Sequence, residues 1–416
     1  MRILHTSDWH LGNSLYGRRR YEEFERFLEW LLDTIKKEEI DVLLISGDVF
    51  DSPVPGNRAL ELYYGFLCSV ARSVCRHVVV TGGNHDSPSL LNAPKELLGF
   101  LDVHVFGSLP ENPDECVILL GKDEGDGVYP PEDQGVIVCA VPYLRDRDIR
   151  RAEANESMED KNRRFSEGIY QKYDLVCKRA LEIREKSGIN YPVIATGHLF
   201  ATGGKTTEGD GVRELYVGTL CRVDASHFPE CIDYLALGHL HIPQTVGGNE
   251  KHRYSGSPLP MGFGEAKQQK KVIVAELSPG VCDTWDISVP VLQRLETVRG
   301  DLDDISGRIN GIIKSETPVW AEVIYEGQDI VTDLSGIVEG LVKNSCVEIL
   351  RIKNNRFADS VLRGMEEGET LDDLSEMDVF RRCLSYNQVP SNQHESLIAT
   401  YSEVLNSLFE EDTLAE

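Results

Sequence analysis

A chain of 416 residues is too long for one ordinary hydrophobic core, so we expect two or three domains. Hydrophobic residues make up 41% of it and charged residues 27%, which excludes a disordered or fibrous protein. No apolar run approaches the roughly 18 residues that span a bilayer. The net charge of −26 excludes a protein that coats nucleic acid by bulk attraction, but it does not exclude a metal site, where bound cations reverse the local charge.

The start of the chain and its cysteines bear on the cellular compartment. A secretory signal needs a basic start, an apolar core and a cleavage site, whereas here the first predicted strand runs directly into Asp8 and His10. The 10 cysteines are scattered, without a C-x-x-C pair or a zinc-finger spacing. We therefore expect a cytoplasmic, nucleoid-associated protein with reduced thiols and no disulfide framework.

In chain order, residues 1–280 alternate apolar strands with amphipathic helices. The expected strands are 3–4, 42–45, 78–80, 136–138, 193–195, 234–236 and 272–274, and the expected helices include 21–35, 60–70 and 162–186. Continuous apolar strands between amphipathic helices are typical of sheets covered on both faces. We predict an α/β fold, a two-sheet sandwich with helices on both outer faces. Residues 122–134, rich in Gly, Pro, Asp and Glu, are expected to form an exposed hairpin or loop.

A smaller domain is expected at residues 281–355. Within it, residues 291–355 follow the order strand, helix, strand, helix, strand, which predicts a compact α+β module. A polar linker is expected at 356–374, and a helical tail at 375–416. The second helix of this tail has an apolar face, which must pack on its own domain or in the groove of a partner.

Five short polar motifs each end a predicted strand. They are Asp8-Trp9-His10, Gly47-Asp48-Val49-Phe50-Asp51, Gly83-Asn84-His85-Asp86, Gly197-His198 and Gly238-His239-Leu240-His241. In open α/β sheets, ligands bind outside the carboxyl ends of strands, so side chains from these loops can converge on one point. Each motif alone is weak, because such sequences are common in turns, but all five in this order predict a single site.

The residue types in these motifs suit a pair of divalent cations. Two ions roughly 3.5–4 Å apart stabilise both the attacking and the leaving oxygen of an in-line displacement at phosphorus. Such a pair needs a bridging anion with two oxygens, which fits Asp48. Asp8 and His10, like His239 and His241, are two residues apart and present side chains on one side of the chain. Imidazole nitrogens combined with carboxylate and amide oxygens suit manganese, iron or zinc better than calcium.

His85 differs from the candidate ligands because it directly follows one of them, Asn84. An imidazole that titrates near neutral pH can protonate a leaving alkoxide or stabilise a charged transition state. Asp86 is expected to orient it as a hydrogen-bond acceptor. Five lone histidines outside the motifs are interpreted as structural or surface residues; they are His77, His104, His227, His252 and His394.

These residues resemble the calcineurin-like metallophosphoesterase superfamily and, within it, the SbcD family of nuclease subunits. The phrases that carry the resemblance are 5–12, 47–51, 236–241 and 254–258. The resemblance covers residues 1–280 by motif and the remainder only by its organisation. It implies a metal-dependent DNA exonuclease and endonuclease that acts on DNA ends and hairpins, with two divalent metal ions, most often Mn²⁺.

The resemblance also implies a role for each matching residue. It assigns His85 as the catalytic histidine. It assigns metal one to Asp8, His10, Asp48 and His241, and metal two to Asp48, Asn84, His198 and His239.

The partners that the resemblance implies are DNA and a coiled-coil ATPase of the SbcC type, which would dock on the C-terminal helices. Residues 281–355 would then be a capping domain that shapes access for the substrate. The family forms a homodimer within a heterotetramer, and helices at 57–73 or 89–101 are the candidates for that contact.

Two basic clusters are candidates for contact with DNA phosphates, and a solvated surface is the alternative interpretation of each. They are Arg18-Arg19-Arg20 and the group of Arg145, Arg147, Arg150 and Arg151. The strongly acidic balance of the chain indicates that a partner helps to hold DNA.

Two other functions stay open. A phosphatase or phosphodiesterase acting on other substrates could use the same two metals, although protein phosphatases typically place Arg-Gly after the bridging aspartate segment. Here that segment continues as Asp51-Ser52-Pro53. A non-catalytic scaffold is the second alternative, but it has no need for a full set of metal ligands.

Overall fold

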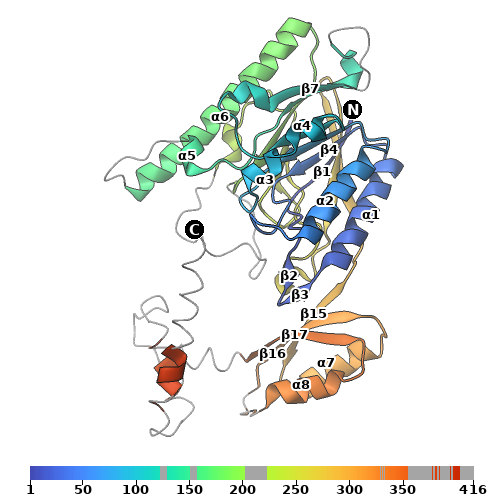
Figure 1. Ribbon diagram of the computed structural model, residues 1–416, viewed down its shortest axis with the longest axis vertical. Helices are drawn as coiled ribbons and strands as arrows, with labels where there is room; N and C mark the ends of the chain where they lie inside the picture. Colours follow the sequence, from blue (N-terminus) through green and yellow to red (C-terminus); the bar gives the residue numbers. More distant parts are fainter. Residues whose placement is uncertain are drawn as a thin grey trace. The chain divides into compact units, whose positions relative to one another are not determined.

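The computed structural model describes residues 1–121, 129–149, 157–201, 223–327, 329, 331 and 333–354, and in the tail only 377, 380, 381, 384, 394 and 397–402. The chain divides into two compact units, Met1–Leu295 and Glu296–Glu416 (Figure 1). Within the described residues, no helix combines the length and the apolar character that a membrane crossing requires.

Two six-stranded sheets form the body of the first unit, in the orders β14-β13-β1-β4-β5-β6 and β11-β12-β10-β9-β8-β7. The first contains β1 (Arg2–Thr6), β4 (Val42–Ser46), β5 (His77–Thr81), β6 (Val103–Phe106), β13 (Lys271–Ser278) and β14 (Val281–Ser288). The second contains β7 (Val117–Gly121), β8 (Gly135–Cys139), β9 (Val193–His198), β10 (Tyr234–Gly238), β11 (Gln244–Val246) and β12 (Asn249–Tyr254). Strands β1, β4, β5 and β6 run parallel to one another, as do β8, β9, β10 and β12.

The apolar runs in the strands follow from burial on both faces. In β4, Val42 and Leu44 pack in the layer between the two sheets, where they meet residues such as Val138 of β8. The alternate residues Leu43 and Ile45 pack outward against helices. Because successive side chains point to opposite faces of a strand, both sets must be apolar.

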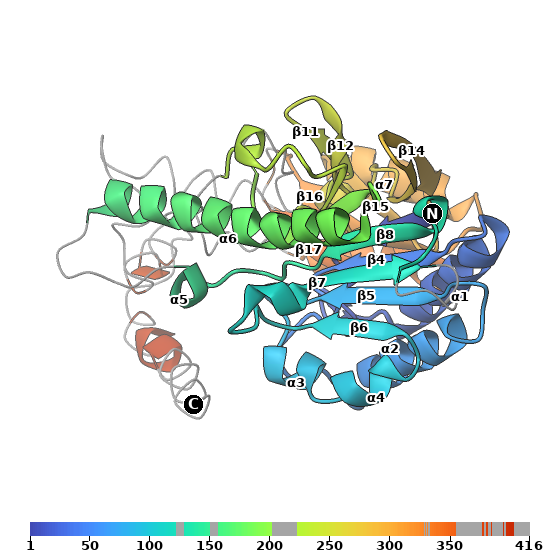
Figure 2. The ribbon, with the colours of Figure 1, turned by 90° about the horizontal axis from the view of Figure 1, so that it is seen from above.

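Helices cover the outer face of each sheet (Figure 2). The first sheet is covered by α1 (Tyr21–Lys37), α2 (Asn57–Val70), α3 (Pro88–Asn92) and α4 (Lys95–Gly99). The second is covered by α6 (Met158–Ser187), which follows the short α5 (Asp146–Ile149). The predicted α/β sandwich is confirmed.

Some elements differ from the prediction. Strand β14 pairs with β13, so residues 281–288 belong to the first sheet and not to the smaller domain. Strand β14 lies at the edge of the sheet and its residues alternate between exposed and half-buried, so the sequence contains no apolar run that would predict a strand there. The helix expected at 89–101 is two short helices, because Pro94, the N-cap of α4, cannot donate a helical hydrogen bond. Within the expected hairpin, residues 122–128 lie outside the described part, but the flanking strands β7 and β8 pair antiparallel.

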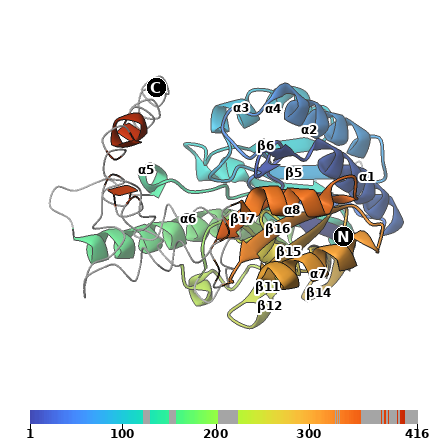
Figure 3. The ribbon, with the colours of Figure 1, turned by 90° about the horizontal axis from the view of Figure 1, so that it is seen from below.

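The second unit has the predicted order of strand, helix, strand, helix, strand. Its elements are β15 (Arg294–Gly300), α7 (Leu302–Ile313), β16 (Val319–Tyr325), α8 (Leu334–Val342) and β17 (Val347–Asn354). Strand β16 is central in the three-stranded sheet and runs parallel to β17. Figure 3 shows α7 and α8 side by side, and both helices share a core with Val298, Val323 and Tyr325.

Little of the tail belongs to the described part of the chain. Its described residues are helical, and the rings of Phe380 and Tyr401 stack with centroids 4.1 Å apart. The linker at 356–374 lies outside the described residues. The domain boundaries and the docking role of the tail stay predictions.

Candidate metal centre

The polar motifs follow the carboxyl ends of strands in both sheets. Asp8, Asp48 and Asn84 come after β1, β4 and β5, while His198 ends β9 and His239 directly follows β10. Backbone hydrogen bonds join the first two loops, because the N–H of Asp8 donates to Gly47 O at 3.0 Å. Loops from the two sheets meet here, as expected for ligands bound outside the carboxyl ends of parallel strands.

The backbone is unusual at several of these residues. Asp8, His10, Asp48 and His239 have φ of 53°, 48°, 50° and 99°. This left-handed region costs a residue that carries a Cβ about 1–3 kcal/mol, and such conformations cluster at functional sites. Four of them among the residues of one site indicate that the fold sacrifices stability to aim these side chains.

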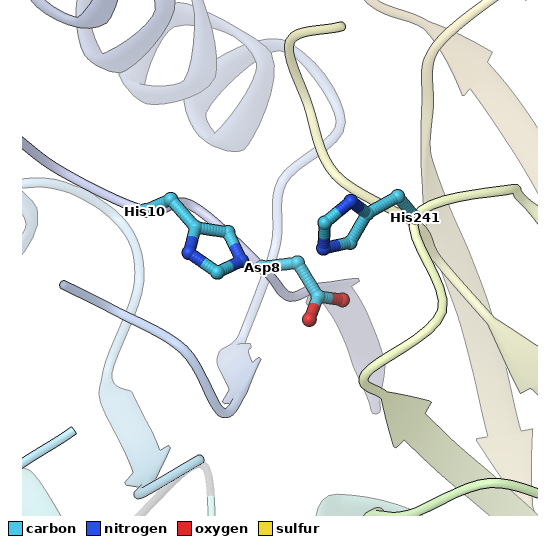
Figure 4. A group of neighbouring side chains, drawn as sticks. All are labelled: Asp8, His10 and His241. Carbon is cyan, nitrogen blue, oxygen red and sulfur yellow. The ribbon is translucent and has the colours of Figure 1, made fainter. Parts of the chain in front are cut away.

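One group of potential ligands consists of Asp8, His10 and His241. One ligand atom of each lies within 4.8 Å of the others. Figure 4 shows the imidazoles of His10 and His241 on either side of the Asp8 carboxylate. His10 is buried; among the described residues its Nε2 has no hydrogen-bond partner, whereas its Nδ1 lies 3.4 Å from Asp51 Oδ1. Buried nitrogens without partners are what a site for a cation requires.

A second group consists of Asp48, His198 and His239, again with one ligand atom of each within 4.8 Å of the others. His198 Nε2 lies 3.1 Å from Asp48 Oδ2. Asn84 Oδ1 lies 3.0 Å from both His198 Nε2 and His239 Nδ1. The two groups adjoin, because Asp48 Oδ2 is also 3.7 Å from His10 Nε2 of the first group. Asp48 therefore lies between the two groups, and its role as a bridging ligand stays a prediction.

The protonation of the second group is governed by burial and by mutual charge. Burial alone would raise the pKa of Asp48, but His198 and His10 outweigh it and hold that pKa well below its usual range. Burial opposes the charged form of His198, but Asp48 outweighs burial and raises the pKa of His198 to about 9. Burial, followed by the charge of His198, lowers the pKa of His239 to about 3. A divalent cation competes with protons for these lone pairs, so its binding would release protons.

His85 lies at the edge of both groups. Its Nδ1–H donates to the carbonyl oxygen of Asp51 at 2.9 Å, and its backbone N–H donates to Asp48 Oδ1 at 2.9 Å. Its ring centroid is 4.9 Å from that of His10. Burial is the largest influence on the pKa of His85 and lowers it. The contact with Asp51 leaves Nε2 as the ring nitrogen that can face a substrate.

Asp86 does not orient His85, and this expectation is corrected. Its carboxylate accepts backbone N–H bonds from Val49 at 3.1 Å, Phe50 at 3.0 Å and Gly83 at 2.8 Å. Burial, followed by the charge of Asp48, raises the pKa of Asp86 to about 6. Asp86 therefore fastens the loop after β4 to the loop after β5, and Asp51 holds the imidazole instead.

The first basic cluster is divided by burial. Arg18 and Arg19 are exposed on the short strand β3 (Arg18–Arg19), which pairs with β2 (Ser14–Leu15). Arg20 is buried, and its guanidinium donates to both carboxylate oxygens of Glu23 and to Pro260 O. The expectation that Arg20 contacts phosphate is therefore corrected. In the second cluster, Arg150 and Arg151 lie outside the described residues.

A buried ion pair next to His241 was missed by sequence reasoning. Glu265 Oε1 lies 3.4 Å from His241 Nδ1, and the Glu265 carboxylate also accepts from Lys270. Lys270 Nζ donates to His241 O and to Ser257 Oγ, both at 3.0 Å. These contacts fix the position of His241. Burial disfavours the charged form of its imidazole, but the Glu265 carboxylate outweighs burial and raises the pKa of His241 to about 9. In sequence, Glu265 and Lys270 lie in a polar run that is typical of surface.

A cavity of about 240 Å³ adjoins the second group of ligands. Asn84, His198 and His239 line one part of it, and aromatic side chains line another. The aromatic side chains are Tyr143, Phe165 and Phe200. The centre therefore borders an apolar surface that can receive part of a substrate.

Comparisons with known proteins agree with this geometry. The calcineurin-like phosphoesterase family matches residues 1–243, and the family described as type 5 capsule protein repressor C-terminal domain matches residues 291–388. The chain is 33% identical to the D subunit of the nuclease SbcCD from Escherichia coli K12, over 98% of each chain. It is 34% identical to the protein of that name from Bacillus subtilis, over 68% of each chain, and 35% identical to that of Rhodobacter capsulatus, over 67% of each.

Proposed function

The chain belongs to the calcineurin-like phosphoesterase family and, within it, to the SbcD nuclease subunits, and from this premise we propose that it cleaves DNA phosphodiesters at a dinuclear metal centre. The observation that carries the proposal is the meeting of two adjoining groups of ligand atoms, contributed by loops of both sheets. A chain with only a structural role would have no use for such a convergence.

We propose that Asp8, His10, Asp48 and His241 hold one ion and that Asp48, Asn84, His198 and His239 hold the other, with Mn²⁺ as the preferred metal. The buried Nε2 of His10, which has no hydrogen-bond partner in the described part of the chain, fits this assignment. Such ions, when bound, polarise a phosphate and supply a nucleophilic hydroxide. The nitrogen and oxygen donors also fit iron or zinc, so the preference for manganese rests on the family.

His85 is the proposed catalytic histidine. Because its Nδ1–H is committed to Asp51 O at 2.9 Å, a second proton would reside on Nε2. From there the imidazolium can donate to the leaving oxygen or stabilise charge on the phosphate. Asp51 thus acts as the positioning residue for His85.

The cavity beside His198 and His239 supports a nucleic acid as the substrate. Its aromatic residues, Tyr143, Phe165 and Phe200, offer surfaces on which an unstacked base can pack. Stacking on aromatic side chains is the usual way in which proteins hold unpaired nucleotides. Arg18 and Arg19, both exposed, stay candidates for phosphate contact.

We propose that the chain works with a coiled-coil ATPase of the SbcC type, since the relatives are named as subunits of a complex, SbcCD. The tail at 375–416 is the proposed docking segment, and residues 281–355, apart from strand β14, form the proposed capping domain. A homodimer is also proposed. In the region expected to support it, Leu97 and Phe100 are 72% and 87% exposed, which is unusual for large apolar side chains without a partner.

The test is a nuclease assay on hairpin and blunt-ended DNA with Mn²⁺, Mg²⁺ or a chelator, with and without the ATPase. The wild-type chain is compared with Asp48→Ala and with the exposed control Asp33→Ala. We expect cleavage that needs metal, is abolished by Asp48→Ala and is unchanged by Asp33→Ala. A parallel assay with nitrophenyl diester and monoester tests the alternative, because a preference for the monoester would indicate a phosphatase.

A further inference from the structure

A second group of histidines lies at the opposite end of the first sheet from the metal centre. His77 is the first residue of β5, whereas the ligand loop with Asn84 follows the last residue of that strand, Thr81. His104 lies on the neighbouring strand β6, paired with Val79, and Asp102 directly precedes that strand. Residues 77 and 79 share one face of β5, and Val79 packs between the two sheets, so both imidazoles project toward that layer.

The hydrogen bond of His77 defines its tautomer. Its Nε2 lies 2.9 Å from the carbonyl oxygen of Gly121, which can only accept, so Nε2 carries the proton. Nδ1 therefore presents a lone pair. This is the arrangement found in metal-binding histidines, where the second nitrogen donates to a carbonyl that fixes the ring. Gly121 belongs to β7, so the fixed ring connects the two sheets.

The side chains of this group lie close together, and two of their ring nitrogens make no hydrogen bond with any described residue. His77 Nδ1 and His104 Nε2 are both buried and have no hydrogen-bond partner in the part of the chain that the structure describes. Asp102 Oδ1 lies 4.0 Å from His77 Nδ1. One ligand atom each of His77, Asp102 and His104 lies within 4.8 Å of the other two. Two buried, unpartnered nitrogens beside a carboxylate favour a cation between them.

We propose that His77, Asp102 and His104 bind one transition-metal ion of the Zn²⁺ class, independently of the catalytic pair. Two imidazole nitrogens and one carboxylate oxygen, with a water in the fourth position, are a common tetrahedral set for zinc. Tetrahedral ligand atoms lie about 3.3 Å apart. The ligand atoms, now within 4.8 Å of one another, would therefore have to approach by up to about 1.5 Å. The side chain of Asp102, 60% exposed, can rotate toward the ion, and the two imidazoles would need a small turn about their side-chain bonds. The bound ion would tie the start of β5 to the start of β6 and, through His77, to β7.

The experiment counts zinc in the full chain after metal removal, exposure to Zn²⁺ and dialysis. An Asp48→Ala background weakens the catalytic centre, so that the second site is measured with less interference. In that background we compare His104→Ala with His227→Ala, whose imidazole is exposed and belongs to neither group. We expect His104→Ala to lose one equivalent of zinc and His227→Ala to lose none. Equal zinc content in the two variants would overturn the proposal.

A second variant guards against a failure of His104→Ala to fold. Asp102→Asn keeps the shape of the side chain, and asparagine tolerates the positive φ of 55° at this position. We expect it to fold, to bind zinc at least tenfold more weakly, and to lose the rise in melting temperature that Zn²⁺ gives to the parent chain. An unchanged zinc affinity in Asp102→Asn would contradict the proposal.

Discussion

Gly47 lies against the imidazole of His198 so closely that a Cβ at position 47 would come within 2.1 Å of His198 Nδ1. That nitrogen already contacts the carbonyl oxygen of Ser46 at 3.0 Å. The loop after β4 therefore supplies a proposed ligand, Asp48, and also the surface that holds a ligand from the other sheet. Position 47 therefore requires glycine for two reasons: the lack of space beside His198, and a φ of +89°, which lies in the left-handed region.

Replacing Gly47 with alanine should displace His198 and weaken metal binding. Gly17 is a matched control, since its φ is +83° but a Cβ added there would meet nothing within 4 Å. Both substitutions should cost about 1–2 kcal/mol for the backbone conformation. Gly47→Ala should cost a further 1–3 kcal/mol, roughly, for overpacking. Urea unfolding and metal content measure the two effects, and equal results for both variants would contradict the role given to Gly47.

His85→Ala should retain metal but lose about 10²- to 10⁴-fold in turnover, because the variant lacks the proposed proton donor. Its imidazole is held by Asp51 O and is not one of the proposed ligands. Turnover on DNA and metal content are measured together on the same preparation. His85 also lies within ligand distance of His10 and Asp51. Loss of metal along with activity would therefore reassign His85 as a ligand.

Glu265→Gln should destabilise the fold and weaken metal binding near His241. Lys270 is buried, so the loss of its anionic partner should cost about 3–5 kcal/mol. The altered support of His241 should lower metal affinity by about 10- to 100-fold. Glu276→Gln is the control, because Glu276 is half exposed in its 3.2 Å pair with Arg2 and should cost under about 1 kcal/mol. Similar losses of stability and metal affinity in the two variants would show that the buried Glu265 pair contributes no more than an exposed ion pair.

The sequence predicted best those features that depend on neighbouring residues, namely the apolar strands and the polar motifs that directly follow them. The apolar run of β4 could be recognised as a strand because every residue of Val42–Ser46 is buried and apolar contacts lie on both faces. The motif residues were found because each follows such a strand, and parallel strands bring their carboxyl ends to one edge. The polar strands β11 and β12 carry no comparable pattern and were not predicted.

What the sequence could not provide are contacts between residues distant in the chain. Nothing near Arg20 indicates that Pro260 O, 240 residues away, accepts from its guanidinium and helps to bury it. The same holds for Asp86, whose partners Val49 and Phe50 lie on another loop. A charged residue is usually exposed, and only the tertiary structure reveals the compensating partners.

His5 gives the fold a dependence on pH that is separate from the metal centre. It is buried in β1, with Nδ1 3.0 Å from the hydroxyl oxygen of Tyr234. Burial, followed by the charge of Arg253, lowers its pKa from 6.5 to about 3. The unfolded chain therefore binds this proton more readily, and the stability that neutral His5 contributes is complete above pH 6.5 and lost as the pH falls toward 3.

His5→Asn, which does not titrate, should thus destabilise the metal-free chain less at pH 4.5 than at pH 7.5, by roughly 2–3 kcal/mol. Urea unfolding at both pH values measures the difference, with the exposed His227→Asn expected to cost under about 0.5 kcal/mol at each. A penalty for His5→Asn that is the same at both pH values would mean that His5 takes up its proton without unfolding.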